Sequence, residues 1–287
     1  MAGMLREKPF EGALALVLAG KPGPGATFYW LGQAGFVIDI AGKRLVIDPY
    51  LSDSLAIKYR GARYPHRRMM PPPIAPAELM GADYVLCTHA HTDHMDPGTL
   101  PALFAANPAT ALIAPRAVRA AALERSGLPE TRTRFVDAGE TISLGDGLEV
   151  IPTRAAHETI ERDADGNHRF LGFLIKGQDV TLWHSGDTIP FDGQVEEVSP
   201  HRPDIALLPV NGRRQELSSQ GVPGNLSLAE AVELTRAIRA PNMIAHHYGL
   251  FDFNTIEPEL IDSMAQSLDD VRIERARQAI AFEWTLT

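Results

Sequence analysis

A segment of six residues, 89–94, contains three histidines and one aspartate and begins one residue after an apolar run at 84–87: His89, His91, Asp93 and His94. Imidazole nitrogens and carboxylate oxygens are the donors that borderline divalent ions such as Zn²⁺ accept. A histidine-rich surface turn is the alternative, but the whole chain has only 10 histidines, and three lie here. The segment therefore predicts a metal site at the end of a strand.

The spacing within this segment predicts two ions. In an extended segment His89 and His91 point to the same side, so they can share one ion. Asp93 and His94 then turn the other way, and we expect them to hold a second ion beside the first.

These four residues match the His-x-His-x-Asp-His signature one by one, and the chain here resembles the metallo-β-lactamase superfamily. The resemblance implies a third histidine, a bridging aspartate and a last histidine, each at the end of a later strand. The candidates stand in that order as His157, Asp187 and one of the neighbours His246 and His247, of which the resemblance favours His247. His184 is expected to pack against the site.

Two divalent ions about 3.5–4 Å apart can share a water, lower its pKa and polarise the carbonyl or phosphoryl oxygen under attack. Asp93 and Asp187 are therefore predicted catalytic carboxylates, and Asp187 is expected to bridge the ions. Asp48 is a third candidate, because an aspartate at the end of the 45–47 strand can orient a ligand histidine, although an ordinary Asp-Pro turn is the alternative. The predicted cofactors are two ions, Mn²⁺ or Zn²⁺, and iron also suits these donors.

Further motifs resemble the L-ascorbate-6-phosphate lactonase-like branch of that superfamily. They are Trp30-Leu31-Gly32-Gln33-Ala34-Gly35-Phe36, a Pro-rich segment at 64–76, and Leu208-Pro209-Val210-Asn211-Gly212-Arg213. The N-acyl-phosphatidylethanolamine phospholipase D group is similar in its first strands and its metal motif, so the Asn-Gly-Arg segment discriminates better between the two. The resemblance implies a hydrolase that opens a lactone, in this branch a lactone of a phosphorylated sugar acid.

Such a small anionic substrate needs a cationic anchor for its phosphate, and guanidinium groups bind phosphate in a bidentate fork. Two arginine pairs compete for this role, and two polar residues are placed to donate hydrogen bonds to the substrate or an oxyanion. The anchors are Arg213 and Arg214 or else Arg67 and Arg68, and the donors are Asn211 and Tyr248. A structural partner for the Tyr248 hydroxyl is an alternative.

Two other functions remain open from the sequence. A phosphodiesterase would use the same ions on a small nucleotide or a phospholipid head group. A non-catalytic metal-binding scaffold would retain the ligands without turnover. The resemblance further implies a homo-oligomer.

Composition limits partners and location. The net charge of −9 and the pI of about 5.6 argue against a nucleic acid polymer as partner, since that binding normally calls for a basic surface. Cys87 is the only cysteine, so no intrachain disulfide can form, and we expect a small buried residue and a cytoplasmic protein. The apolar octet 13–20 is too short for a membrane span and predicts a surface helix.

The pattern of apolar runs and turn residues predicts an α/β chain with an N-terminal helical extension at 1–25 and a single hydrolase domain at 26–287. Two β-rich halves with helices outside predict a four-layer αββα sandwich. A meander of strands at 28–31, 36–40 and 44–47 opens the domain. Asp96 and Pro97 predict the start of a helix through about residue 104, and Ser227 and Glu230 predict a capping box that begins another.

Overall fold

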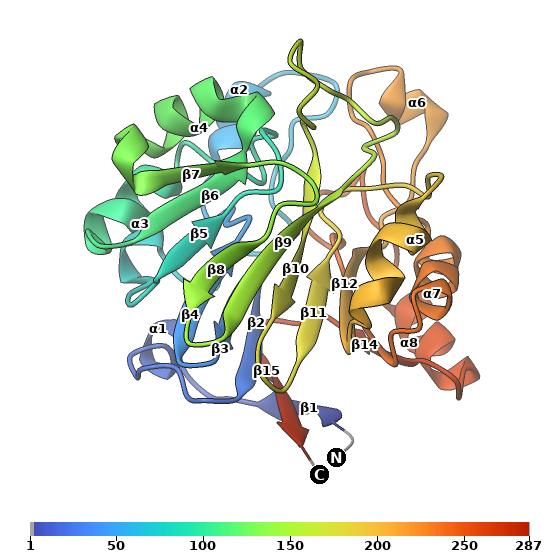
Figure 1. The fold of residues 1–287 in the computed structure, drawn as a ribbon. Helices are drawn as coiled ribbons and strands as arrows, with labels where there is room; N and C mark the ends of the chain where they lie inside the picture. The colour runs from blue at the N-terminus through green and yellow to red at the C-terminus, as the bar shows by residue number, and fades with distance from the viewer. Residues whose placement is uncertain (1–2, 287) are drawn as a thin grey trace. The chain divides into compact units, whose positions relative to one another are not determined.

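The strands form two mixed sheets in the computed structural model, which describes residues 3–286 (Figure 1). Each sheet belongs to its own compact unit. The first unit takes in the chain up to Val136 and again from Arg277, and the second unit spans Asp137–Ala276. The predicted α/β class is confirmed. The predicted domain division at residues 25 and 26 stays a prediction.

The sheet of the first unit combines an antiparallel half with a parallel half. Its strand order is β1 (Gly3–Pro9), β15 (Ile280–Leu286), β2 (Ala26–Gly32), β3 (Gly35–Ile40), β4 (Lys43–Ile47), β5 (Tyr84–Leu86), β6 (Ala111–Pro115) and β7 (Thr133–Val136). Neighbours from β1 to β4 are antiparallel, and those from β4 to β7 are parallel. The predicted antiparallel meander β2-β3-β4 is confirmed. Its strands are joined by short turns, whereas parallel strands need longer crossover connections.

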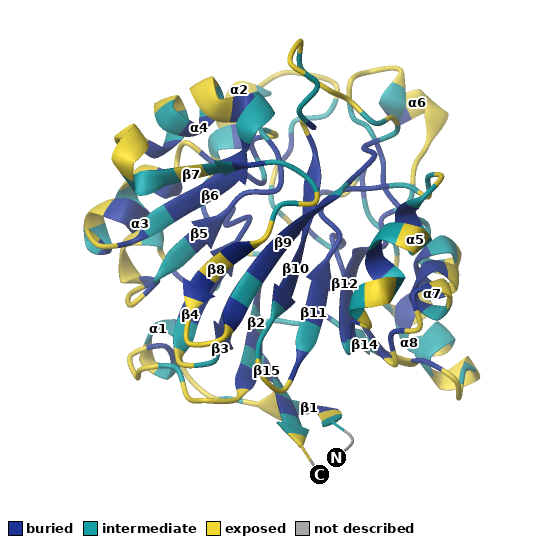
Figure 2. Ribbon diagram, in the orientation of Figure 1, coloured by how far each residue is buried: buried dark blue, intermediate teal, exposed yellow. Residues whose placement is uncertain are grey.

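The crossovers of the first unit carry its helices. They are α1 (Leu14–Val17), α2 (Ser54–Lys58), α3 (Leu100–Ala106), α4 (Arg119–Ser126) and the 3₁₀ helices Pro76–Glu78, Arg116–Val118 and Glu130–Arg132. Apolar side chains of α3, including Leu100 and Leu103, pack in one buried cluster with Val85 of β5 and Leu112 of β6. Strand β6 is buried over most of its length (Figure 2). This burial fixes β5 at the centre of the parallel half, and the ligand segment starts where β5 ends.

The sheet of the second unit has the order β14 (Arg272–Arg275), β13 (Asn242–His246), β12 (Ile205–Pro209), β11 (Thr181–His184), β10 (Leu171–Lys176), β9 (Leu148–Arg154) and β8 (Ile142–Gly145). Strands β8 to β11 pair antiparallel, and β11 to β14 pair parallel. Its helices are α5 (Gln194–Val198), α6 (Gln215–Ser218), α7 (Leu228–Ala237), α8 (Pro258–Ser267) and the 3₁₀ helix Ser199–His201. The capping box predicted at Ser227 and Glu230 is confirmed.

Two predictions of local structure are wrong. The helix expected from Pro97 begins at Leu100. Gly98 donates its backbone N–H to the Asp96 carboxylate at 2.9 Å, so Asp96 stabilises a turn before the helix. The N-terminal extension is helical only over Leu14–Val17, because Gly3–Pro9 forms a strand that pairs with β15.

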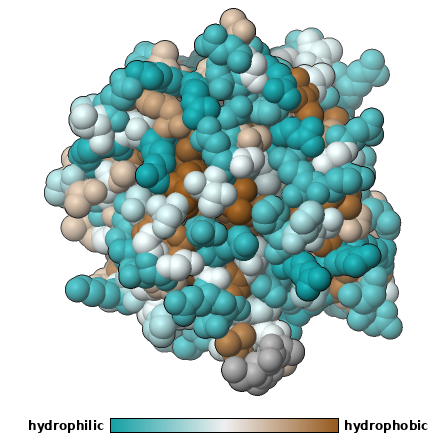
Figure 3. Space-filling view, in the orientation of Figure 1, coloured by the Kyte–Doolittle hydropathy of each residue, from teal (hydrophilic) through white to brown (hydrophobic). Residues whose placement is uncertain are grey.

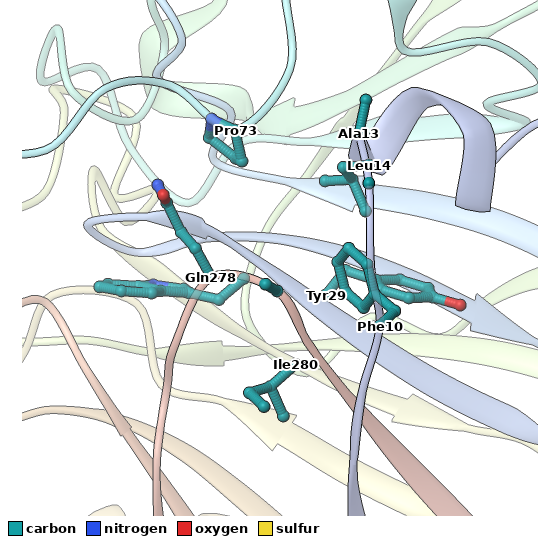
Figure 4. A pocket seen from close by; sticks show the side chains of 10 residues that line it. Phe10, Ala13, Leu14, Tyr29, Pro73, Gln278 and Ile280 are labelled. Atoms are coloured by element: carbon teal, nitrogen blue, oxygen red, sulfur yellow. The ribbon is translucent and has the colours of Figure 1, made fainter.

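The first unit also contains a small cavity of about 160 Å³ beside the N-terminal segment (Figure 4). Its lining is mainly apolar and includes Phe10, Leu14, Tyr29, Pro73 and Ile280. No predicted ligand or substrate contact lines this cavity, so it lies apart from the predicted chemistry.

Most residues visible on the face in Figure 3 are hydrophilic. Among residues 3–286, no helix is long and apolar enough to cross a bilayer. Cys87 is buried, as predicted, and burial raises the pKa of its thiol well above the ordinary value.

Candidate metal centre

The ligand segment of the first unit is a tight loop. The backbone N–H groups of His94 and Met95 both donate to the carbonyl of His91, at 3.1 and 2.9 Å. The segment bends at 88–91 and turns at 92–94, so the expectation of an extended backbone is wrong. The predicted pairs of donors are kept, because ligand atoms of His89 and His91 lie within 4.8 Å of each other, as do those of Asp93 and His94. The imidazoles converge: the ring centroid of His89 lies 4.7 Å from that of His91 and 4.0 Å from that of His94.

The donor atoms in this loop are close enough to coordinate ions. Ligand atoms of His89 lie within 4.8 Å of those of His91 and His94, and a carboxylate oxygen of Asp93 lies equally near His94. His89 and His94 are buried, whereas His91 is exposed. The first unit thus brings together all four predicted ligands of the motif.

Asp48 is buried beneath the loop and accepts three hydrogen bonds. They come from His94 Nδ1 at 2.7 Å, Thr88 N at 2.7 Å and Thr88 Oγ1 at 2.6 Å. Because an ionised carboxylate only accepts, the proton of His94 sits on Nδ1, and the lone pair of the ring is on Nε2. That nitrogen lies 3.8 Å from Asp93 Oδ2. A histidine oriented by a carboxylate in this way is a common arrangement at zinc sites.

Sequence reasoning assigned no role to two residues that hold this loop. Gln33 Nε2 donates to Asp93 Oδ2 at 2.8 Å. The guanidinium of Arg125, from α4, donates to the carbonyl of Ala90 and to that of Met95 at 3.3 Å. The only signal for Gln33 was its place in the motif at 30–36, and the sequence carries none for Arg125.

The second unit brings its three predicted ligands together from three strand ends. His157 follows β9, Asp187 follows β11 and His247 follows β13. His157 Nε2 lies 3.7 Å from Asp187 Oδ2, and His247 Nε2 lies 3.2 Å from the same oxygen. All three side chains are buried. Their donors converge on one carboxylate.

His246 and His247 lie in different surroundings. His246 is the last residue of β13, and its ring stacks on that of His184 with centroids 5.0 Å apart. Burial, and then the neighbouring imidazole of His184, hold the pKa of His246 well below its ordinary value. His247 has a left-handed backbone, with φ at 62°, and reaches Asp187. The geometry of the second unit therefore favours His247 over His246 as a ligand.

The predicted anchors at Arg213 and Arg214 have protein partners. Two nitrogens of Arg213 donate to the two carboxylate oxygens of Glu230, both at 2.6 Å. These bonds hold the pKa of Glu230 at about 2. Arg214 donates to the carbonyl of Phe253. Arg213 thus braces the capping box of α7.

The other predicted substrate contacts differ in whether protein groups already bind their side chains. Asn211 is buried and donates to Asn254 Oδ1 at 2.9 Å, and the Tyr248 hydroxyl donates to the carbonyl of Ala276. Arg68 stacks over the ring of Tyr50, 4.9 Å from its centroid, and donates to nearby backbone carbonyls. Arg67 is exposed, and no hydrogen bond or ion pair joins it to any residue within 3–286. It is therefore accessible to a ligand.

The donor set fits the implied metal. Each unit offers imidazole nitrogens and at least one carboxylate oxygen, and one buried carboxylate, Asp48, lies behind a ligand imidazole. This combination suits zinc, manganese and iron.

Comparison with known proteins gives a family match over most of the chain. A profile of the beta-lactamase superfamily domain matches residues 43–248. A metal-dependent hydrolase of Pyrobaculum aerophilum is 28% identical over 246 residues, which cover 85% of this chain and 93% of the relative.

An N-acyl-phosphatidylethanolamine-hydrolyzing phospholipase D of Caenorhabditis elegans is 24% identical over 240 residues, covering 79% of this chain and 65% of the relative. Among solved structures, an isothiocyanate hydrolase from Delia radicum gut bacteria aligns with a TM-score of 0.67 at 20% identity, over 91% of this chain and 98% of the other. This last likeness supports the fold alone.

Proposed function

The chain belongs to the beta-lactamase superfamily, and on that premise we propose that it is a metal-dependent hydrolase that opens the lactone of a phosphorylated sugar acid. Three observations support the assignment as a metal-dependent hydrolase: the match to the superfamily, the similarity to metal-dependent hydrolases and the clustered His and Asp donors. The proposal of a lactone substrate is supported by the motifs at 30–36 and 208–213, which resemble the lactonase-like branch.

The observation that carries the proposal is the buried Asp48–His94 pair beneath a loop of converging imidazoles. A histidine-rich surface turn would not need a buried carboxylate to fix one tautomer. We propose seven ligands for two divalent ions, and all of them fall within the residues that match the superfamily: His89, His91, Asp93, His94, His157, Asp187 and His247.

Bound ions at these residues would lower the pKa of a water and polarise the carbonyl under attack. The chain itself supplies orientation and charge. Asp48 keeps the proton of His94 on Nδ1, Gln33 holds one oxygen of Asp93, and Asp187 presents its carboxylate to two histidines. No Ser or Cys nucleophile is required in this scheme.

Arg67 is the best candidate for the phosphate anchor. Its guanidinium is exposed and without a protein partner among the described residues, whereas Arg213 already holds both oxygens of Glu230. Arg68 can assist from the same loop. We keep the homo-oligomer and the cytoplasmic location as predictions.

A phosphodiesterase is the second candidate, because the similarity to the Caenorhabditis elegans phospholipase D extends over 240 residues. The same ions would then polarise a phosphoryl oxygen, and the two reactions differ only in the substrate that the surrounding residues admit.

The test is a substrate panel with purified protein loaded with Mn²⁺ or Zn²⁺. The panel contains phosphorylated and unphosphorylated sugar lactones and bis(p-nitrophenyl) phosphate, and the controls are chelator-treated protein and the His91→Ala variant. We expect turnover of phosphorylated lactones that is lost in both controls. Diester turnover alone would favour the second candidate, and retained metal without any turnover would indicate a non-catalytic scaffold.

A further inference from the structure

We propose that the turn at residues 32–35 positions the ligand carboxylate of Asp93, and that Gln33 is the residue through which it acts. The inference rests on the proposed two-ion function and assigns a part in it to a residue that is not itself a ligand. Every contact that carries it lies within the first unit.

Gln33 makes a direct and well-formed contact with the ligand. Its side chain is 2% exposed, and its amide Nε2 donates to Asp93 Oδ2 at 2.8 Å. The same oxygen lies 3.8 Å from His94 Nε2, so the amide donor stops the carboxylate from rotating and holds this oxygen beside the ring nitrogen that would share an ion with it. Because an amide is neutral, Asp93 keeps its full negative charge, which a lysine or arginine in the same place would offset.

Gln33 has an unfavourable backbone conformation. Its φ is 52°, in the left-handed region that most residues with a Cβ avoid. Glycine would adopt this conformation more readily, but glycine has no amide to offer to Asp93. The indole N–H of Trp30 donates to the carbonyl of Gln33 at 3.0 Å and so secures the strained residue from the preceding strand.

The same turn also packs against the backbone of Asp48, whose carboxylate accepts a hydrogen bond from His94. A Cβ on Gly35 would lie 3.0 Å from the backbone carbonyl oxygen of Asp48, so a larger residue would have to push this backbone away by a few tenths of an ångström. Asp48 in turn holds His94 through its Nδ1. A single turn therefore contacts both the carboxylate of Asp93 and the backbone of the residue that orients His94.

The experiment compares two variants of Gln33 with a matched control. Gln33→Met keeps the length of the side chain and removes the donor. Gln33→Asn keeps an amide but is one methylene shorter, and asparagine tolerates a left-handed backbone, so this variant tests the idea if the first fails to fold. The control is Gln278→Met, the same change at a partly exposed glutamine of the same unit that donates to the carbonyl of Pro71.

The readout is metal binding, followed by titrating the full chain with Co²⁺ and recording the visible absorption of the bound ion. We expect the wild type and Gln278→Met to bind two ions alike. In both Gln33 variants, the affinity for one of the two ions should fall by about 10- to 100-fold, the usual effect of losing a partner behind a ligand, and the absorption of that ion should change. The melting temperature without metal should change little in Gln33→Asn.

Two results would overturn the inference. If Gln33→Met or Gln33→Asn binds both ions with wild-type affinity and spectrum, Gln33 has no positioning role, and the proposed function stands. If the wild type binds no Co²⁺, the proposed function fails and this inference fails with it.

Discussion

In the first unit the proposed ligands occupy one continuous loop after β5, whereas in the second unit the proposed ligands His157, Asp187 and His247 follow three different strands. The first loop is short, and the surrounding unit holds it through side chains: Asp48 and Gln33 bind the ligands, and Arg125 binds the backbone. In the second unit the strands themselves set the positions.

The two units therefore position metal-binding side chains in different ways. A local loop concentrates donors but has no paired strands to set their spacing, so hydrogen bonds from the surrounding unit orient its side chains. Ligands at the ends of paired strands inherit their spacing from the sheet. The loops of His157 and Asp187 are also joined by two hydrogen bonds, from Ala156 N to Thr188 Oγ1 at 3.1 Å and from Ile189 N to the carbonyl of Ala156 at 2.8 Å.

Removal of a direct ligand from the loop should have the largest effect. His91→Ala deletes one of the converging imidazoles, and we expect the loss in kcat/KM to exceed the about 10- to 100-fold typical of partners behind the ligands. The metal-free protein should keep its circular dichroism spectrum, because the His91 side chain is exposed. Metal content per chain and kcat/KM are the measurements. Activity within about tenfold of wild type would contradict the assignment.

Substitutions of His246 and His247, at and just after the end of β13, test which of the two is the ligand in the second unit. His247→Ala should lose metal and activity to a similar extent as His91→Ala. His246→Ala should retain metal but lower the free energy of unfolding by about 1–3 kcal/mol, because it leaves a cavity beside the buried ring of His184. Urea unfolding and metal analysis of both variants give the answer. The opposite pattern would make His246 the ligand.

The sequence predicts more of the ligand loop than of its support. The loop motif is contiguous, so its donors can be recognised without the fold. Gln33 and Asp93 are 60 positions apart, and Arg125 contacts Ala90 over 35 positions, so neither contact leaves a local pattern. The bend of the loop itself was missed for a related reason, because alternation assumes an extended backbone that backbone hydrogen bonds replace here.

The same reasoning explains which elements of the fold were predicted. The meander and the start of α7 depend on turns and a capping box within a few residues, and both are confirmed. The strand at Gly3–Pro9 was missed because it exists only through its partner β15 at the other end of the chain. The partners of Arg213 and Tyr248 likewise come from segments that no sequence motif connects with them.

Asp48→Asn should lower metal affinity less than the loss of a ligand does. It measures how much metal binding by the loop depends on the hydrogen bond between Asp48 and His94. The amide keeps the shape, but its neutral oxygen is a weaker acceptor for His94 Nδ1 than the carboxylate. We expect metal affinity to fall by about 10- to 100-fold, with both ions still able to bind at high concentration. Competition with a chelator measures this. Asp83→Asn, which alters an acceptor of the Arg44 backbone N–H, is the control and should leave metal affinity unchanged.

The smallest effect is expected at Arg213, which in the second unit supports a helix rather than the ligands. Arg213→Ala should lower the free energy of unfolding at pH 7 by only about 0.5–1 kcal/mol, since its ion pair with Glu230 is partly exposed. The folded-state pKa of Glu230 is about 2, below its ordinary 4.5, so the pair stabilises the fold above about pH 4.5 and loses that contribution as the pH falls toward 2.

Urea unfolding of wild type and Arg213→Ala at several pH values tests this dependence, and the difference between them should be constant near neutrality and shrink below pH 4.5. Arg67→Ala is the matched comparison, because Arg67 is exposed and outside the ligand support. It should leave stability unchanged and raise KM for a phosphorylated substrate, whereas Arg213→Ala should leave KM unchanged. A raised KM in Arg213→Ala alone would move the phosphate anchor from the Pro-rich loop of the first unit to the second unit.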